Sequence, residues 1–142
     1  MKSLKHFLHG NRRELITIKP DATVFEGLTL MMQHNISAIL IVENDNLKGI
    51  FTERDYARKI ALQGKTSKEV ILHEVMTTDL ITVSPEDSIE NCMQIMTNKH
   101  IRHLPIVENQ QLQGIISIGD LVKLVIEDQK QTIVELESYI RG

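Results

Sequence analysis

Two short stretches of the chain carry a hydroxyl and a carboxylate three residues apart. They are Thr52-Glu53-Arg54-Asp55 and Ser117-Ile118-Gly119-Asp120. At the start of a helix, this spacing places both side chains on one face of the first turn. A carboxylate can accept two hydrogen bonds from a ribose diol, and its charge strengthens them. A hydroxyl beside a helix N-terminus suits a phosphate. The two stretches could therefore hold a ribose and an anion.

The same spacing is also that of a plain helix cap, in which hydroxyl and carboxylate satisfy free backbone N–H groups. Thr23 and Glu26 form such a pair in this chain. Glu or Gln is the better capping partner, whereas both stretches use the shorter Asp. A glycine, Gly49 or Gly114, precedes each stretch and lets a ligand approach the backbone closely. These features favour a ligand role, although one residue can do both.

An internal repeat relates the two stretches. Residues 16–57 align with residues 81–122 without a gap, 65 residues later, and share 13 identities in 42 positions. Self-similarity at a fixed distance indicates a tandem duplication. Each copy has about 60 residues, near the size at which a lone core is marginal, so we expect the two halves to pack together as one cooperative unit.

Each copy reads as strand, helix, strand, strand and helix, after a short lead-in helix. β-Branched residues before a proline predict the first strands at 16–18 and 81–83. An unbroken apolar run, 37–42, predicts a buried strand that leads into a hairpin. The last helix continues from Asp120 to about Tyr139 with heptad-like apolar spacing, which is more than a small domain needs.

The predicted fold is therefore α+β, with repeat 1 at residues 4–65, repeat 2 at residues 66–126 and a helical extension at residues 127–142. In the first helix of each repeat, apolar spacing predicts a core-facing stripe. The stripe comprises Val24, Leu28, Met31 and Met32 in the first copy, and Ile89, Met93 and Met96 in the second. Cys92 is expected to be a buried small hydrophobe.

Composition excludes several classes of function. The net charge of −3 and the pI near 6.1 argue against a nucleic-acid or anionic-membrane surface. A single cysteine cannot form an internal disulfide and fits a reducing compartment. The charged N-terminus lacks the apolar core of a signal peptide, and no apolar run reaches the length of a membrane span. We expect a cytoplasmic protein.

No catalytic or metal motif stands out. His100 and His103 are three residues apart, but they lie at a helix-to-strand transition and no cysteine or carboxylate completes a ligand set. There is no P-loop, no GxGxxG and no nucleophile in motif context. We therefore expect neither an enzyme nor a catalytic cofactor.

The second copy, with His100-Ile101-Arg102-His103-Leu104-Pro105-Ile106-Val107 and Gly114-Ile115-Ile116-Ser117-Ile118-Gly119-Asp120, resembles the cystathionine-β-synthase (CBS) domain. The first copy, with Gly49-Ile50-Phe51-Thr52-Glu53-Arg54-Asp55, is similar to the same motif in stand-alone CBS pairs. The resemblance implies a Bateman module: two repeats related by a pseudo-two-fold, with two clefts for adenosine-containing ligands. It also implies a homodimer of four repeats.

The resemblance also implies site residues. Asp55 and Asp120 would hold the ribose hydroxyls, and Thr52 and Ser117 would lie near ribose or phosphate. Further candidates are Ser37, Ala38, His103 and Leu104 for adenine, Lys19 and Ser84 for base or sugar, and Arg54, Arg58 and Arg102 for phosphate. Arg54 and Arg58 could equally lie on a solvated helix face. Because glycine stands at 119 where the first copy has Arg54, we predict unequal sites.

The expected function is regulatory. The module would bind AMP, ADP, ATP or NAD(H), and a separate protein partner would read its response through the dimer face or the helix from Asp120 to Tyr139. S-adenosylmethionine is a further ligand that the resemblance implies. The alternative is a constitutive dimeric scaffold protein with vestigial clefts, in which the last helix does the binding.

Overall fold

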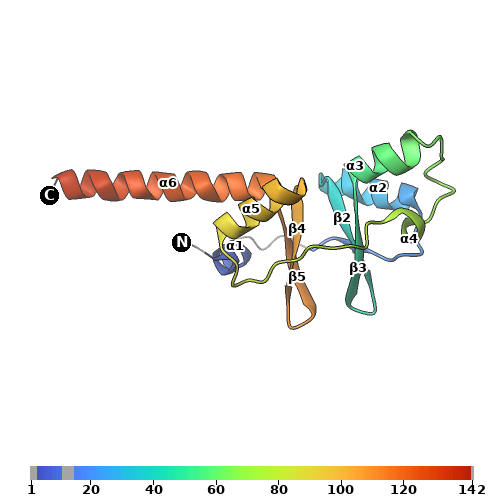
Figure 1. The fold of residues 1–142 in the computed structure, drawn as a ribbon, viewed down its shortest axis with the longest axis horizontal. Coiled ribbons are helices and arrows are strands. Elements are labelled where there is room, and N and C mark those ends of the chain that lie inside the picture. The colour runs from blue at the N-terminus through green and yellow to red at the C-terminus, as the bar shows by residue number, and fades with distance from the viewer. Residues whose placement is uncertain (1–2, 11–14, 142) are drawn as a thin grey trace. The chain divides into compact units, whose positions relative to one another are not determined.

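The computed structural model describes residues 3–10 and 15–141 (Figure 1). The fold is α+β and divides into two compact units. We call residues 13–81 with 108–112 the first-repeat unit, and residues 1–12, 82–107 and 113–142 the second-repeat unit. The predicted domain boundaries remain predictions.

The first-repeat unit is built around a three-stranded sheet of order β1-β2-β3. Strand β1 pairs with β2 in parallel, and β2 pairs with β3 as an antiparallel hairpin. In chain order, its elements are β1 (Thr17–Ile18), α2 (Val24–His34), β2 (Ala38–Glu43), β3 (Asn46–Thr52), α3 (Glu53–Asp55), the π-helix η1 (Tyr56–Ala61) and α4 (Leu72–Val75). Asn44 and Asp45 both have positive φ, which the hairpin turn requires.

The second-repeat unit repeats this design with a smaller sheet. Its elements are α1 (Leu4–Gly10), α5 (Ile89–Lys99), β4 (His103–Glu108), β5 (Gln111–Ser117) and α6 (Ile118–Arg141), with β4 and β5 forming a two-stranded sheet. The long last helix is confirmed. Figure 1 shows α6 extending past α5, against which its first turns pack.

The predicted strand at 81–83 is reduced to one parallel bridge between Val83 and Ile106. Val83 donates to the carbonyl of Pro105 at 3.0 Å, and Val107 donates back to Val83 at 2.8 Å. The next bond toward the N-terminus would need a donor at Pro105, and proline has no N–H. Leucine at the matching position, Leu40, has this donor, so only the first copy forms a regular strand.

Hydroxyl caps start the first long helix of each unit as predicted. Thr23 Oγ accepts from Glu26 N, and Ser88 Oγ accepts from Asn91 N, both at 3.1 Å. Both helices end at a residue in the left-handed region, Asn35 in α2 and His100 in α5. The two helices thus begin and end in the same way.

Each lead-in helix packs in the unit of the other repeat. Leu72, the first residue of α4, donates to the carbonyl of Ala22 at 2.8 Å in the first-repeat unit. Leu4, the first residue of α1, donates to the carbonyl of Asp87 at 3.0 Å in the second-repeat unit. Helix α1 precedes the first repeat but packs in the second-repeat unit, and α4 precedes the second repeat but packs in the first-repeat unit. Each unit therefore contains residues of both repeats.

The core follows the predicted pattern with one exception. Residues 38–41 of β2 are all buried, and Met31, Met96 and Cys92 are buried as expected. Met32 is 84% exposed, so its assignment to the core-facing stripe of α2 was wrong. At 100° per residue, it lies beside Met31 but past the edge of the buried face.

Within residues 3–10 and 15–141, no helix is both long enough and apolar enough to cross a membrane.

Candidate functional site

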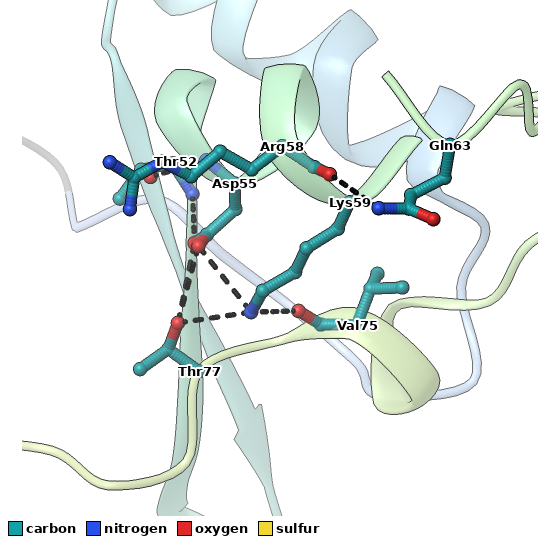
Figure 2. Close-up of polar contacts among 7 residues, drawn as sticks. All are labelled: Thr52, Asp55, Arg58, Lys59, Gln63, Val75 and Thr77. Atoms are coloured by element: carbon teal, nitrogen blue, oxygen red, sulfur yellow. Dashed lines mark hydrogen bonds and ion pairs between the residues drawn. The ribbon is translucent and has the colours of Figure 1, made fainter. Parts of the chain in front are cut away.

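Asp55 and Thr52 form a reciprocal pair where β3 passes into α3 (Figure 2). Thr52 Oγ1 accepts from the N–H of Asp55 at 3.0 Å, and Asp55 Oδ2 accepts from the N–H of Thr52 at 3.0 Å. Asp55 therefore completes a full capping box despite its shorter side chain. The choice of Asp over Glu carries no argument against a capping role.

Two residues that the sequence did not point to, Lys59 and Thr77, also hold the Asp55 carboxylate. Lys59 Nζ lies 3.4 Å from Asp55 Oδ1, and Thr77 Oγ1 donates to the same oxygen at 3.3 Å. The side chain of Asp55 is only 15% exposed, against 38% for Lys59. The Asp55–Lys59 spacing of four residues was the available signal for Lys59, since opposite charges at this spacing meet on a helix. No local pattern could have found Thr77, which lies 22 residues away.

Asp120 and Ser117 repeat the pair in the second-repeat unit. Asp120 Oδ2 accepts from the N–H of Ser117 at 2.9 Å, and Ser117 Oγ accepts from the N–H of Asp120 at 3.1 Å. The two oxygens Asp120 Oδ2 and Ser117 Oγ are also hydrogen-bonded at 3.0 Å. The residue that corresponds to Lys59 is Leu124, so this carboxylate lacks the lysine that neutralises Asp55.

The start of strand β2 lies beside the Thr52–Asp55 pair, and the start of β4 lies beside the Ser117–Asp120 pair. Glu53 N donates to the carbonyl of Ser37 at 3.0 Å, and Ala38 is the register partner of Thr52. Correspondingly, Ile118 N donates to the carbonyl of Arg102 at 2.9 Å. The structure therefore places Ser37 and Ala38 next to the first pair.

In the second-repeat unit, the counterparts of Ser37 and Ala38 are Arg102 and His103, 65 residues later. Arg102 is exposed, and His103 is the first residue of β4. Leu104 is fully buried, so its side chain belongs to the core, and only its backbone could face a ligand. Arg102 and His103 are thus the residues of this strand that lie nearest to Ser117 and Asp120.

Lys19 and Ser84 lie toward the other end of their strands. Thr17 and Ile18 pair with Leu40 and Ile41 in parallel, so Lys19 continues toward Val42, about four residues or roughly 13 Å along β2 from Ala38. The structure does not bring Lys19 to the Thr52–Asp55 pair.

Ser84 follows the matching bridge at Val83. Its N–H donates to Asp87 Oδ2 at 2.7 Å, and its Oγ accepts from the N–H of Glu86 at 3.2 Å. These bonds form the turn that leads into α5. A structural role therefore accounts for Ser84.

The arginines lie on the helix that Asp55 begins. Arg54 and Arg58 are exposed, and the side chain of Arg58 runs back toward the Thr52 end of the helix in Figure 2. From Tyr56 the helix widens into the π-helix η1, which contains Arg58, and Leu62 N donates to the carbonyl of Ala57, five residues back, at 2.9 Å. Single π turns of this kind occur often at functional sites.

The space beside the first glycine is filled by the chain itself. A Cβ on Gly49 would lie 2.7 Å from Met76 Sδ and 2.9 Å from the carbonyl oxygen of Thr77. A Cβ on Gly114 would lie 3.1 Å from Leu8 Cδ2. At Gly49, side-chain and backbone atoms of the chain occupy this space, so the expectation that a ligand uses it was wrong there. At Gly114, only the end of the Leu8 side chain lies nearby, and the expectation remains a prediction.

Two further groups bear on chemistry. Burial, and to a lesser degree the charge of Asp87, raises the pKa of the Cys92 thiol from 9.0 to about 11, so the thiol is protonated at neutral pH. Across the part of the chain that the structure describes, no three His, Cys, Asp or Glu side chains gather as metal ligands would.

The repeated geometry agrees with comparison to known families. The family model of the CBS domain matches residues 8–62 and 72–127. The chain belongs to the CBS-domain family. The two matches cover both of the hydroxyl–carboxylate pairs, Thr52 with Asp55 and Ser117 with Asp120.

Two CBS-domain relatives are similar over most of the chain. The CBS domain-containing protein CBSX3, mitochondrial, of Arabidopsis thaliana is 41% identical over 127 residues, which are 86% of this chain and 62% of that protein. The CBS domain-containing protein YhcV of Bacillus subtilis is 41% identical over 108 residues, which are 76% of each chain. The chain thus spans about three fifths of the plant relative.

Solved CBS structures share the fold. A protein with CBS domains from Burkholderia ambifaria MC40-6 matches with a TM-score of 0.86 and 40% identity, over 90% of this chain and 96% of that one. The CBS domain pair of protein MJ0100 matches with a TM-score of 0.78 and 25% identity, over 90% and 98%. The latter was solved in complex with methylthioadenosine and S-adenosyl-L-methionine.

Proposed function

We propose that this CBS pair binds an adenosine-containing small molecule through the Thr52–Asp55 and Ser117–Asp120 pairs. The observation that carries the proposal is the repetition of one arrangement: a hydroxyl and a carboxylate at a helix start, beside the first residues of a neighbouring strand. A helix cap alone needs no particular strand beside it. The adenosine ligands held by the MJ0100 pair support the choice of ligand class.

Each group has a role in this proposal. The carboxylate accepts from the ribose hydroxyls, which requires Asp55 or Asp120 to exchange some of its bonds within the chain for bonds to the ligand. The backbone of Ser37 and Ala38, or of Arg102 and His103, recognises the edge of the adenine. The hydrogen bonds from the ribose hydroxyls to the charged carboxylate would contribute about 1.5 to 3 kcal/mol each.

The two sites are proposed to differ in affinity and in the ligand they prefer. The first carries Arg54, Arg58 and Lys59, whereas the matching positions of the second are Gly119, Lys123 and Leu124. With Arg102, which lies beside Ser117 and Asp120, the second site carries two cations against three, and this difference favours a phosphate-bearing ligand such as AMP, ADP, ATP or NAD(H) at the first site. The second site favours a ligand with less negative charge, such as methylthioadenosine.

We further propose a regulatory, non-catalytic protein that acts in the cytoplasm as a homodimer and controls a separate protein partner. A ligand shifts the population of conformations only by its differential affinity for them. At a concentration about 100 times its Kd, it also stabilises the folded state by about 2.7 kcal/mol. The direction of regulation depends on which conformation the partner binds.

A thermal-shift screen tests this function. AMP, ADP, ATP, NAD, NADH, S-adenosylmethionine and methylthioadenosine are added in turn to the purified chain, with adenine and ribose 5-phosphate as fragment controls. The proposal expects a rise in Tm with at least one adenosine ligand and a smaller rise with either fragment. If no adenosine ligand raises the Tm at millimolar concentration, the proposal fails and the constitutive scaffold is favoured instead.

A further inference from the structure

The C-terminal part of α6 has no cover from the rest of the described chain. Every residue from 126 to 141 is exposed, whereas Leu121, Leu124 and Val125 in the first turns are buried or half-buried. In proteins, most of the stability of a helix comes from packing of its apolar face rather than from intrinsic propensity. A packing partner would supply the missing stabilisation.

The exposed residues form a regular apolar stripe. At heptad spacing, Ile126, Ile133 and Ile140 occupy one set of positions, and Val122, Gln129 and Leu136 occupy the other. The five apolar members of this stripe are 44 to 81% exposed. Alternation of three and four residues between successive members is the pattern of a coiled-coil seam, and it extends without interruption from 122 to 140.

The residue types on the seam bear on the number and direction of its strands. Isoleucine at every a position with leucine at the d position 136 matches the pattern of a parallel two-stranded coiled coil, and Val122 and Gln129 occupy the other two d positions. Gln129 is the single polar member of the seam. In a parallel, in-register pair the two Gln129 side chains face each other and can exchange amide hydrogen bonds, whereas an antiparallel pair places each Gln129 opposite Ile133 and leaves it unsatisfied.

The flanking positions also accept this arrangement. In the parallel register, Val125 of one helix lies beside Lys130 of the other, and Thr132 lies beside Glu137. No like charges meet across the seam. On the outward side, Gln131 Nε2 donates to Glu135 Oε1 at 3.1 Å, so these polar residues are paired within the helix itself.

We propose that residues 122–140 of α6 form a parallel, in-register, two-stranded coiled coil with the same helix of a second copy of this chain. The six seam residues, at positions 122, 126, 129, 133, 136 and 140, include none that the proposed nucleotide sites use, so the interface holds two copies together whether or not a ligand is bound. A tail that pairs copies in parallel also fixes the same orientation for both second-repeat units relative to the coiled-coil axis.

Oxidative cross-linking of the full-length chain tests the register. Gln129→Cys places a thiol on the seam, and Gln131→Cys places one on the outward face of the same helix as the matched control. The natural Cys92 is fully buried and protonated, so it does not compete. In dilute solution with a mild oxidant, the proposal expects a disulfide-linked dimer from Gln129→Cys, at least tenfold faster than from Gln131→Cys.

A second variant separates the seam from any other contact between copies. Adding Ile133→Glu to Gln129→Cys puts a charge in the seam and is expected to abolish the cross-link, while circular dichroism shows the repeats still folded. Light scattering of the natural chain should give the mass of two copies. The proposal is overturned if the natural chain is monomeric, if Gln129→Cys cross-links no faster than Gln131→Cys, or if Ile133→Glu leaves the cross-link intact.

Discussion

Lys59 Nζ lies 3.4 Å from Oδ1 of Asp55, one turn earlier on the same helix, and donates to the carbonyl of Val75 at 2.7 Å (Figure 2). A third contact, to Thr77 Oγ1 at 3.4 Å, completes the link. One lysine thus joins the proposed ligand carboxylate to the last residue of α4 and to Thr77, which follows that helix. In the second repeat, Leu124 stands at the matching position, so this link through a lysine is specific to the first repeat.

Lys59→Met should lower the free energy of unfolding by about 1 kcal/mol, because bonds to a charged group are lost from a partly exposed position. Urea unfolding followed by circular dichroism measures the change. Lys65→Met is the control, since Lys65 is exposed in the turn after η1 and its loss should change stability by less than about 0.5 kcal/mol. Equal effects of the two substitutions would contradict a structural role for Lys59.

The two glycines at matching positions should respond differently to alanine. Gly49→Ala forces its Cβ against the backbone carbonyl of Thr77, which cannot rotate away, and should cost about 1 to 3 kcal/mol. Gly114→Ala meets only the end of the Leu8 side chain, which can move, and its smaller cost is partly offset by the less flexible unfolded chain. Thermal unfolding of both variants checks the order, and a larger loss for Gly114→Ala would show that the close approach at Gly49 is unimportant.

Cys92 should be unreactive in the folded protein. Its pKa is raised from 9.0 to about 11, so a disulfide reagent should label it far more slowly at pH 8 than after unfolding in urea. Because the folded pKa is the higher one, the protonated thiol contributes stability below about pH 9, and that contribution is lost as the pH rises toward 11. Rapid labelling of the native chain at pH 8 would contradict this burial.

Much of the fold was predictable from local chemistry. The proline before each first helix, the hydroxyl caps at Thr23 and Ser88, and the buried run of β2 all appear where the sequence indicated. Because the repeat supplies each pattern twice, most of the predicted elements had support from both copies. Where the copies differ, the prediction was weakest: Pro105 in place of Leu40 removed a ladder donor and with it the strand at 81–83.

Only part of the candidate nucleotide site could be predicted from the sequence. The Thr52–Asp55 and Ser117–Asp120 spacings predicted hydroxyl–carboxylate pairs at helix starts, as the structure shows, but Lys59 and Thr77 were missed because their approach to Asp55 depends on where α4 packs. The same packing fills the space beside Gly49 that had been assigned to a ligand. Lys19 was placed near the site by resemblance, yet the parallel register of β1 puts it toward the opposite end of β2.

Isothermal titration calorimetry with aspartate variants tests the central claim most directly. The adenosine ligand with the largest thermal shift is titrated into the natural chain, Asp55→Ala, Asp120→Ala and the double variant. Thr23→Ala serves as the control, because it removes a helix cap outside the proposed sites. The account predicts at least a tenfold loss of affinity in the double variant, about 1.4 kcal/mol, and unchanged affinity in Thr23→Ala. A folded double variant that binds as tightly as the natural chain would show that the two carboxylates are helix caps alone.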